Sequence, residues 1–173
     1  MAVQTIGVTA SIPSDNWELI ASTNPAATTL NFTGISGYKK LMIAFNSVVT
    51  SGPTLNTLRL NNDSTNKYMS SVFRIIGDNS VNNYVSSVGA SAGDWDTKMF
   101  QSIGGTFKHF VVTIENCDNT NLKNFTLECG VSPFQTEKLS GTGIYRASAT
   151  ISQVNLVFGA TFNDTVYLYG VKA

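Results

Sequence analysis

Short segments in which apolar and polar residues alternate recur along most of this chain. Alternation with a period of two is typical of β-strands, whereas an amphipathic helix needs a period near 3.6. In residues 125–131, for example, Phe125, Leu127, Cys129 and Val131 fall on one face. The pattern predicts no long helix, and it predicts strands over residues 3–8, 17–21, 30–32, 41–49, 58–60, 68–76, 84–88, 99–103, 107–114, 125–131, 151–158 and 166–171.

Turn-forming residues lie between these segments, at residues 77–80, 104–105 and 141–143. Gly, Asn and Asp tolerate a left-handed backbone, and Asn, Asp, Ser and Thr hydrogen-bond within their own turn. Many short strands with turns at fairly even spacing are typical of a sandwich or a closed β architecture. No linker or internal repeat divides the chain. We therefore predict an all-β fold, a jelly-roll-like antiparallel β-sandwich that forms a single domain over residues 1–173.

The 173 residues are enough to bury a core without metals or disulfides, because a domain of this size hides about 70% of its unfolded surface. No apolar run approaches the roughly 18 to 20 residues that span a bilayer, so we expect no membrane partner. The N-terminus has no basic residue before a short apolar stretch, which argues against a secretory signal and for folding in a cytoplasm.

Eleven basic residues balance eleven acidic ones, and the basic residues form no larger cluster than Lys39-Lys40. We expect no nucleic-acid partner, because phosphate neutralisation needs several cations on one face. Charged residues make up 13% of the chain, so the surface is largely uncharged and polar. Such a surface suits a protein that packs against others in an assembly, and a β protein with many polar turns explains the composition about as well.

The two cysteines, Cys117 and Cys129, flank a turn-like segment at residues 118–121. A hairpin centred near residues 119 and 120 places Cys117 opposite residue 122, several residues away from Cys129. A disulfide would need a shifted register, so we predict two free, buried thiols. Two cysteines and one histidine do not make a recognisable zinc site, and we expect no cofactor or metal.

Catalytic motifs are missing from the sequence. The single histidine, His109, lies inside a predicted strand, and no nucleophile elbow, phosphate loop or metalloprotease motif occurs. Asp94 and Asp96 flank Trp95, a combination found in sugar or calcium sites, although a solvated loop explains it better. Residues 61–66 are rich in oxygen ligands but lack the spacing of an EF-hand, so we interpret them as a polar loop. We predict that the protein is not an enzyme.

Four short motifs occur in an order that resembles a group of virion proteins of tailed bacteriophages. They are a tryptophan strand at residues 16–21, the segment LNFTGISGYKKL at residues 30–41, the loop LRLNNDS at residues 58–64 with Tyr68 shortly after, and the closing VYLYGV at residues 166–171. The resemblance extends from Trp17 to Val171. It implies a jelly-roll-like fold and a place in the virion as a capsid decoration or cement protein, a head fibre or a tail-associated protein, usually trimeric.

Within that group, the chain lacks the heptads and the second domain that a fibre needs. The resemblance therefore implies a homotrimeric cement protein on the surface of the phage head, bridging subunits of the major capsid protein and assembled in the bacterial cytoplasm. The motif residues also have an internal explanation. Trp17 and Phe32 would then belong to the core, Tyr38 would bridge core and surface, and residues 61–66 would be a loop tip.

A receptor- or glycan-binding tip protein is the alternative. Aromatic faces that stack on a sugar, with carboxylates that hold its hydroxyls, would come from Tyr84, Asp94, Trp95, Asp96 and Tyr145. A glycan-cleaving enzyme would need two carboxylates about 5 to 10 Å apart in a cleft, and nothing in the spacing favours that.

Residues 1–10 are predicted to form an extended N-terminal arm that contacts the capsid or a neighbouring subunit. Val3, Ile6 and Val8 are apolar, and Pro13 with the polar residues after it separates the arm from the tryptophan strand. An extended segment can pair with the edge of another sheet. The equal alternative is that this segment is the first strand of its own sandwich.

Overall fold

The computed structural model describes residues 16–45, 55–76, 84–88, 101–103, 107–131 and 137–173. These residues contain twelve strands and no helix, so none of them forms a helix that could cross a membrane. The strands are β1 (Glu18–Thr23), β2 (Ala27–Thr33), β3 (Tyr38–Phe45), β4 (Leu55–Leu60), β5 (Tyr68–Ile76), β6 (Tyr84–Val88), β7 (Gln101–Ile103), β8 (Phe107–Glu115), β9 (Lys123–Val131), β10 (Glu137–Tyr145), β11 (Gln153–Phe162) and β12 (Val166–Lys172).

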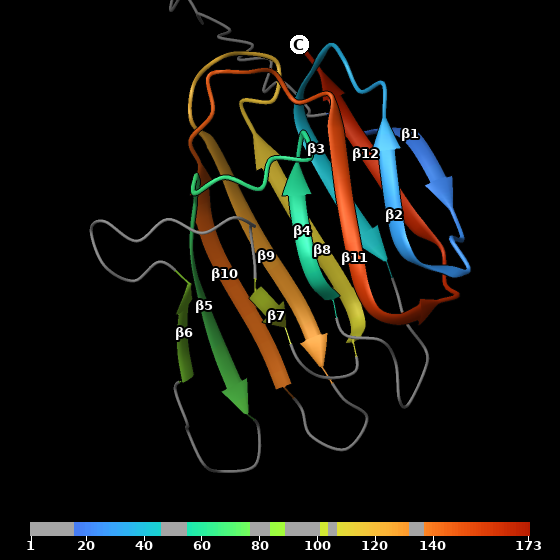
Figure 1. The fold of residues 1–173 in the computed structure, drawn as a ribbon, viewed down its shortest axis with the longest axis vertical. Coiled ribbons are helices and arrows are strands. Elements are labelled where there is room, and N and C mark those ends of the chain that lie inside the picture. The colour runs from blue at the N-terminus through green and yellow to red at the C-terminus, as the bar shows by residue number, and fades with distance from the viewer. Residues whose placement is uncertain (1–15, 46–54, 77–83, 89–100, 104–106, 132–136) are drawn as a thin grey trace, which may run out of the picture.

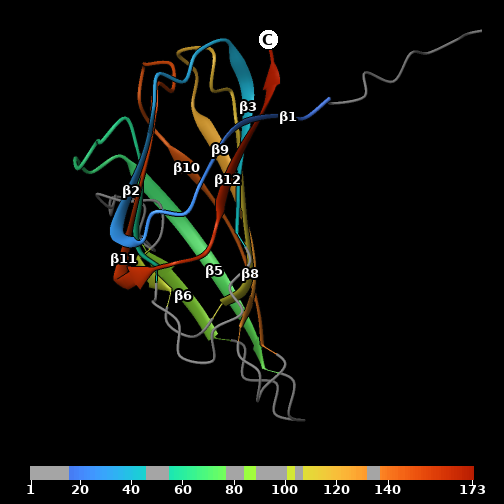
Figure 2. The ribbon, with the colours of Figure 1, turned by 90° about the vertical axis from the view of Figure 1, so that its right-hand side faces the viewer.

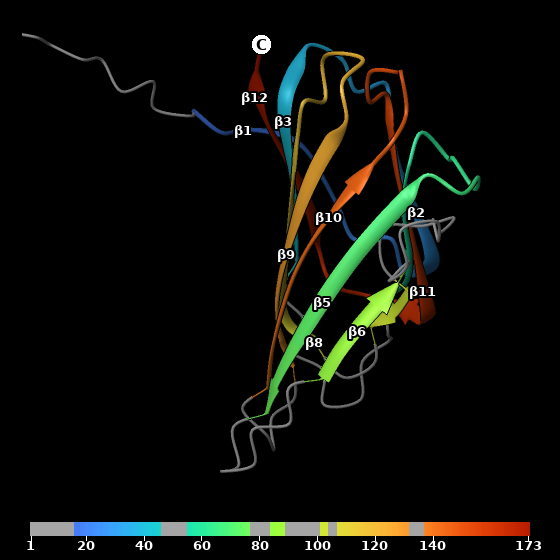
Figure 3. The ribbon, with the colours of Figure 1, turned by 90° about the vertical axis from the view of Figure 1, so that its left-hand side faces the viewer.

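Two antiparallel sheets pack face to face, and the two side views show them as separate layers (Figure 2, Figure 3). The larger sheet has the order β1-β12-β3-β8-β9-β10-β5-β6, and the smaller has the order β2-β11-β4-β7 (Figure 1). The pairs β1·β12, β2·β11, β3·β8 and β4·β7 are nested one inside the other along the chain, which is the arrangement of a jelly roll. The β5–β6 and β9–β10 pairs widen the larger sheet. The predicted jelly-roll-like sandwich is thus confirmed.

The core lies between the sheets and follows the alternation in the sequence. In β9, Phe125, Leu127 and Cys129 are buried, whereas the residues between them are exposed. At one end of the sandwich Phe45 stacks on Phe110 with ring centroids 4.6 Å apart, and it meets the edge of Phe162 from the smaller sheet at 5.1 Å. Aromatic pairs of this geometry add about 0.5–1.5 kcal/mol to the burial of their surface, so they help to hold the two layers together.

The turn predicted at residues 141–143 is wrong, because these residues lie inside β10, a strand that the sequence did not predict. Gly143 pairs with Phe125 on one side and with Ser70 on the other. A Cβ atom at Gly143 would collide with the carbonyl oxygen of Met69 and the ring of Phe125. The glycine is therefore a close-packing position within a strand and not a turn.

The cysteine prediction is confirmed, since Cys117 and Cys129 are both free and buried. Burial raises the pKa of the Cys117 thiol to about 12 and that of the Cys129 thiol further.

His109 lies in β8 as predicted and is exposed. Its ring lies over Gly130, where a Cβ atom would come within 2.7 Å of it. The ring thereby covers backbone that the glycine leaves open.

Candidate functional site

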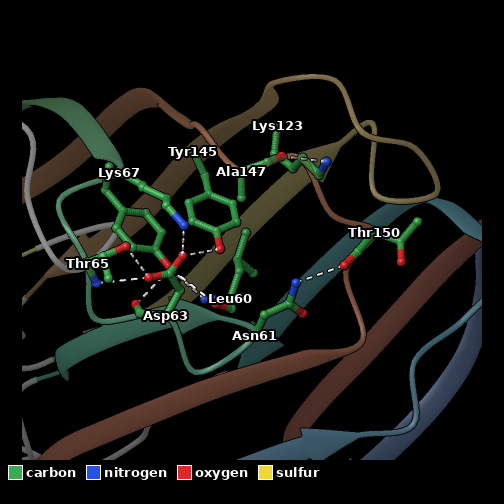
Figure 4. A network of polar contacts seen from close by, with 10 residues as sticks. Leu60, Asn61, Asp63, Thr65, Lys67, Lys123, Tyr145, Ala147 and Thr150 are labelled. Atoms are coloured by element: carbon green, nitrogen blue, oxygen red, sulfur yellow. Dashed lines mark hydrogen bonds and ion pairs between the residues drawn. The ribbon is translucent and has the colours of Figure 1, made fainter.

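A polar network ties the turn between β4 and β5 to the segment between β10 and β11 (Figure 4). The turn begins at Asn61 and Asn62, whose φ values of 54° and 53° lie in the left-handed region that asparagine tolerates better than most residues. The Asn61 amide donates to the carbonyl of Thr150 at 2.8 Å, and its oxygen accepts from the Ser152 N–H at 2.8 Å. One side chain therefore fastens two segments that are distant in sequence.

Asp63 occupies the centre of this network. Its Oδ1 accepts hydrogen bonds from the backbone N–H and the hydroxyl of Thr65, and its Oδ2 accepts from Lys67 Nζ at 3.0 Å and from the Tyr145 hydroxyl at 2.8 Å. Burial alone would raise the pKa of Asp63, but the bonds from Thr65, Lys67 and Tyr145 outweigh it and hold that pKa well below its usual range. The carboxylate is thus ionised and saturated, which suits a structural anchor and not a general base.

Two stacked tyrosines support the turn from the core side. The rings of Tyr68 and Tyr145 have centroids 4.5 Å apart, and neither side chain is more than 1% exposed. The Tyr68 hydroxyl accepts from the Leu60 N–H at 3.0 Å and lies 3.2 Å from the carbonyl oxygen of Asp63. Burial is the main reason why the pKa values of both phenols are raised, so both stay protonated. The turn is fixed in one conformation as a result.

A hollow of about 580 Å³ opens beside this network. It is lined by Asn61, Asp63 and Tyr145, which we call its floor, and by Lys67 and residues 146–149, which we call its walls. Two of these residues, Lys67 and Arg146, are cations, and the Lys67 side chain is 42% exposed. The hollow therefore combines a rigid polar floor with cationic groups that reach solvent.

A buried lysine supports the far side of residues 146–149. Lys123 is 0% exposed, and its ammonium donates to the carbonyls of Asn119 and Asn121 at 2.7 Å and to that of Ala147 at 3.5 Å. Burial lowers the pKa of Lys123, while the neighbouring Cys117 and Asp118 act in the opposite direction. The sequence analysis missed this role, because lysine is ordinarily a surface residue and Lys123 precedes the predicted strand at residues 125–131.

A second feature, an apolar corner, lies on the outer face of the larger sheet, the face turned away from the smaller sheet. We call Trp17, Leu19, Tyr167 and Tyr169 the β1 corner. Leu19 is 54% exposed and pairs with Tyr169, so the two side chains share a face, and Tyr167 and Tyr169 stack at 6.1 Å. Trp17 and Tyr167 are each 36% exposed. The expectation that Trp17 belongs to the core is wrong, because it precedes β1, which is the edge strand of the larger sheet among the described residues.

The other motif residues follow their expected internal roles. Phe32 is buried, and Tyr38 packs against the core while its hydroxyl donates to Glu18 at 2.8 Å. Tyr38 therefore connects the core to the surface, as predicted. Residues 61–66 form the polar turn described above.

The predicted glycan residues are only partly covered by the described part of the chain. Tyr145 lines the hollow through its hydroxyl end, whereas its ring lies against Tyr68 and has no face for a sugar. Tyr84 begins β6. Asp94, Trp95 and Asp96 lie outside the described residues, as do the arm residues Val3, Ile6 and Val8.

No group of three or more His, Cys, Asp or Glu side chains that could hold a metal ion occurs among the described residues. The chain matches no protein-family model, no curated protein and no solved structure.

Proposed function

We propose that this chain is a structural protein of a tailed-phage virion, without enzymatic activity, that decorates the head and stabilises it by bridging major capsid subunits. The fold agrees with the one that the sequence resemblance implies. The observation that carries the proposal is the β1 corner, where large apolar side chains are exposed on the outer face of the larger sheet. Exposed aromatic and aliphatic groups gathered in one patch are typical of the centre of a protein–protein contact.

The β1 corner is proposed as the contact between copies in a homotrimer. Its chemistry fits, because aromatic and aliphatic side chains are enriched at the centre of protein–protein contacts. A stable contact needs about 1,000 Å² or more of buried surface in total, so the rest of the outer face would have to contribute. In this proposal the N-terminal arm, with Val3, Ile6 and Val8, contacts the capsid protein.

Sedimentation velocity tests the subunit contact. Leu19→Asp should convert a trimer into monomers at micromolar concentration, because it places a charge in the centre of the contact. Leu122→Asp is the matched control, since Leu122 is 47% exposed but lies in the loop between β8 and β9. A wild-type monomer, or equal dissociation in the two variants, would refute the trimer contact.

The role in the particle is tested by stoichiometry and stability. A decoration protein should be present in hundreds of copies on purified particles, whereas a tail-tip protein should be present in a few. Particles assembled without the chain should lose DNA at a lower temperature, since a ligand that binds only the assembled shell stabilises it by mass action. Unchanged thermal release of DNA would contradict the decoration role.

The glycan-binding tip remains a second candidate because of one observation, the polar hollow beside Asp63. Its volume falls within the range of about 300–1,000 Å³ that is usual for small-molecule sites. The copy number on particles separates this candidate from the first.

A further inference from the structure

The hollow between the β4–β5 turn and residues 146–149 offers a ligand more hydrogen-bond donors than acceptors. The oxygens of Asp63 accept four hydrogen bonds, and the side-chain oxygen of Asn61 accepts from residues 152 and 153. The acceptors on the floor are thus already occupied by the protein. A ligand would find few acceptors there for its own donors.

Donors, in contrast, remain available on the walls. Lys67 carries three N–H groups, of which one is directed at Asp63. Within the part of the chain that the structure describes, the Arg146 guanidinium has no side-chain partner, and Arg146 is exposed. With two cations against one carboxylate, the lining carries a net positive charge. A guanidinium beside an ammonium is an arrangement that favours a carboxylate ligand.

The walls also restrict the shape of the ligand. Of the strands that frame the hollow, β10 is paired along its whole length, with β9 on one side and β5 on the other. β10 therefore offers no open edge to bind an extended peptide. The aromatic ring in the floor, that of Tyr145, is 1% exposed, so a neutral sugar could not stack on it. Recognition must come from charge and hydrogen bonds to a compact anion.

We propose that this hollow binds the carboxylate of a small organic acid, with Arg146 and Lys67 as the binding cations. The site is preorganised, because Asn61 and Asp63 fix its floor and Lys123 supports its far wall through Ala147. This inference is independent of the decoration role. A site for a small carboxylate does not depend on whether the protein is present on the head or at the tail.

NMR titration of the ¹⁵N-labelled full chain tests the proposal, with acetate and glucuronate as probes. Both should shift the amide signals of Asn61 and of residues 146–149, with millimolar affinity that weakens several-fold when the salt concentration is raised about tenfold. Glucose, which is neutral, is the comparison ligand. Equal binding of glucose would overturn the role of charge, and failure of both carboxylates to bind would overturn the site.

Variants then assign the cation. Arg146→Gln should weaken binding at least about fivefold, and Arg146→Lys should retain part of the affinity because it keeps the charge without the planar fork. The control is Lys172→Gln, which removes the same charge from β12. In the larger sheet β12 is four strand positions from β10, or roughly 19 Å away at about 4.8 Å per strand. This control should change affinity less than twofold. Equal effects of Arg146→Gln and Lys172→Gln would refute the site.

Discussion

Replacing Asp63 with alanine tests whether its carboxylate holds the β4–β5 turn. The substitution removes the acceptor of four hydrogen bonds. The largest loss of stability comes from Tyr145, which is 1% exposed. Its hydroxyl would be left without an acceptor, which costs about 1–3 kcal/mol. The bond from the Thr65 N–H contributes about 1 kcal/mol. Lys67 adds only about 0.5 kcal/mol, because its side chain is 42% exposed and screened by water.

Together these contributions predict that Asp63→Ala lowers the free energy of unfolding by about 3 kcal/mol. With a slope of about 2 kcal/mol per molar urea, the unfolding midpoint should fall by roughly 1.5 M. Urea unfolding followed by far-UV circular dichroism measures this shift. Asp164→Ala, in the turn between β11 and β12, is the matched control and should change the free energy of unfolding by less than about 0.5 kcal/mol.

A double-mutant cycle tests the mechanism of that loss. If the unsatisfied hydroxyl of Tyr145 is the main penalty, Tyr145→Phe in the Asp63→Ala background should recover part of the stability. The double variant should be more stable than the sum of the single effects by about 1–2 kcal/mol. Strict additivity, or a loss of less than about 1 kcal/mol in Asp63→Ala, would refute the reasoning.

Three further predictions follow from other groups. Folding lowers the pKa of Asp63, so the contribution of this carboxylate to stability is complete above the unfolded value of 3.8 and is lost as the pH falls through the lower folded value. Asp63→Asn should therefore make the free energy of unfolding depend less on pH in the acid range. Gly143→Ala should cost at least about 2 kcal/mol, since the new methyl group meets the Met69 carbonyl and Phe125, whereas Thr142→Ala, at the exposed neighbouring position, should cost little in the same urea assay. Cys117 and Cys129 should not react with a thiol reagent at neutral pH until the chain unfolds, and early reaction of either thiol would contradict their burial.

The alternation of apolar residues was sufficient to predict the fold class and most strands. It worked where a strand has one face in the core, as in β9, because burial then selects every second residue. It failed for β10, where Ser140, Gly141 and Gly143 resemble a turn in composition. Gly143 is explained by a ring and a backbone oxygen from neighbouring strands, which no local pattern contains.

The candidate site was predictable only in part for a similar reason. The polar residues 61–66 indicated a loop, and that loop is present. The role of Asp63, however, depends on Tyr145, which lies 82 residues further along the chain. Lys123 and Ala147 are likewise brought together only by the pairing of β9 and β10. Trp17 was misplaced because apolarity alone does not distinguish a core position from an exposed one beside an edge strand.

The positions of the last two strands constrain how this chain is made. β11 lies between β2 and β4, and β12 lies between β1 and β3, so each sheet has a vacant slot until the C-terminal residues are synthesised. A growing chain therefore holds unpaired strand edges in both sheets until β11 and β12 are available, and such edges promote association between nascent chains. Closure joins Glu18 to Gly170 and so requires contacts between strands that are distant in sequence, which slows folding. Loss of even the final strand would leave the product permanently open at the slot between β1 and β3.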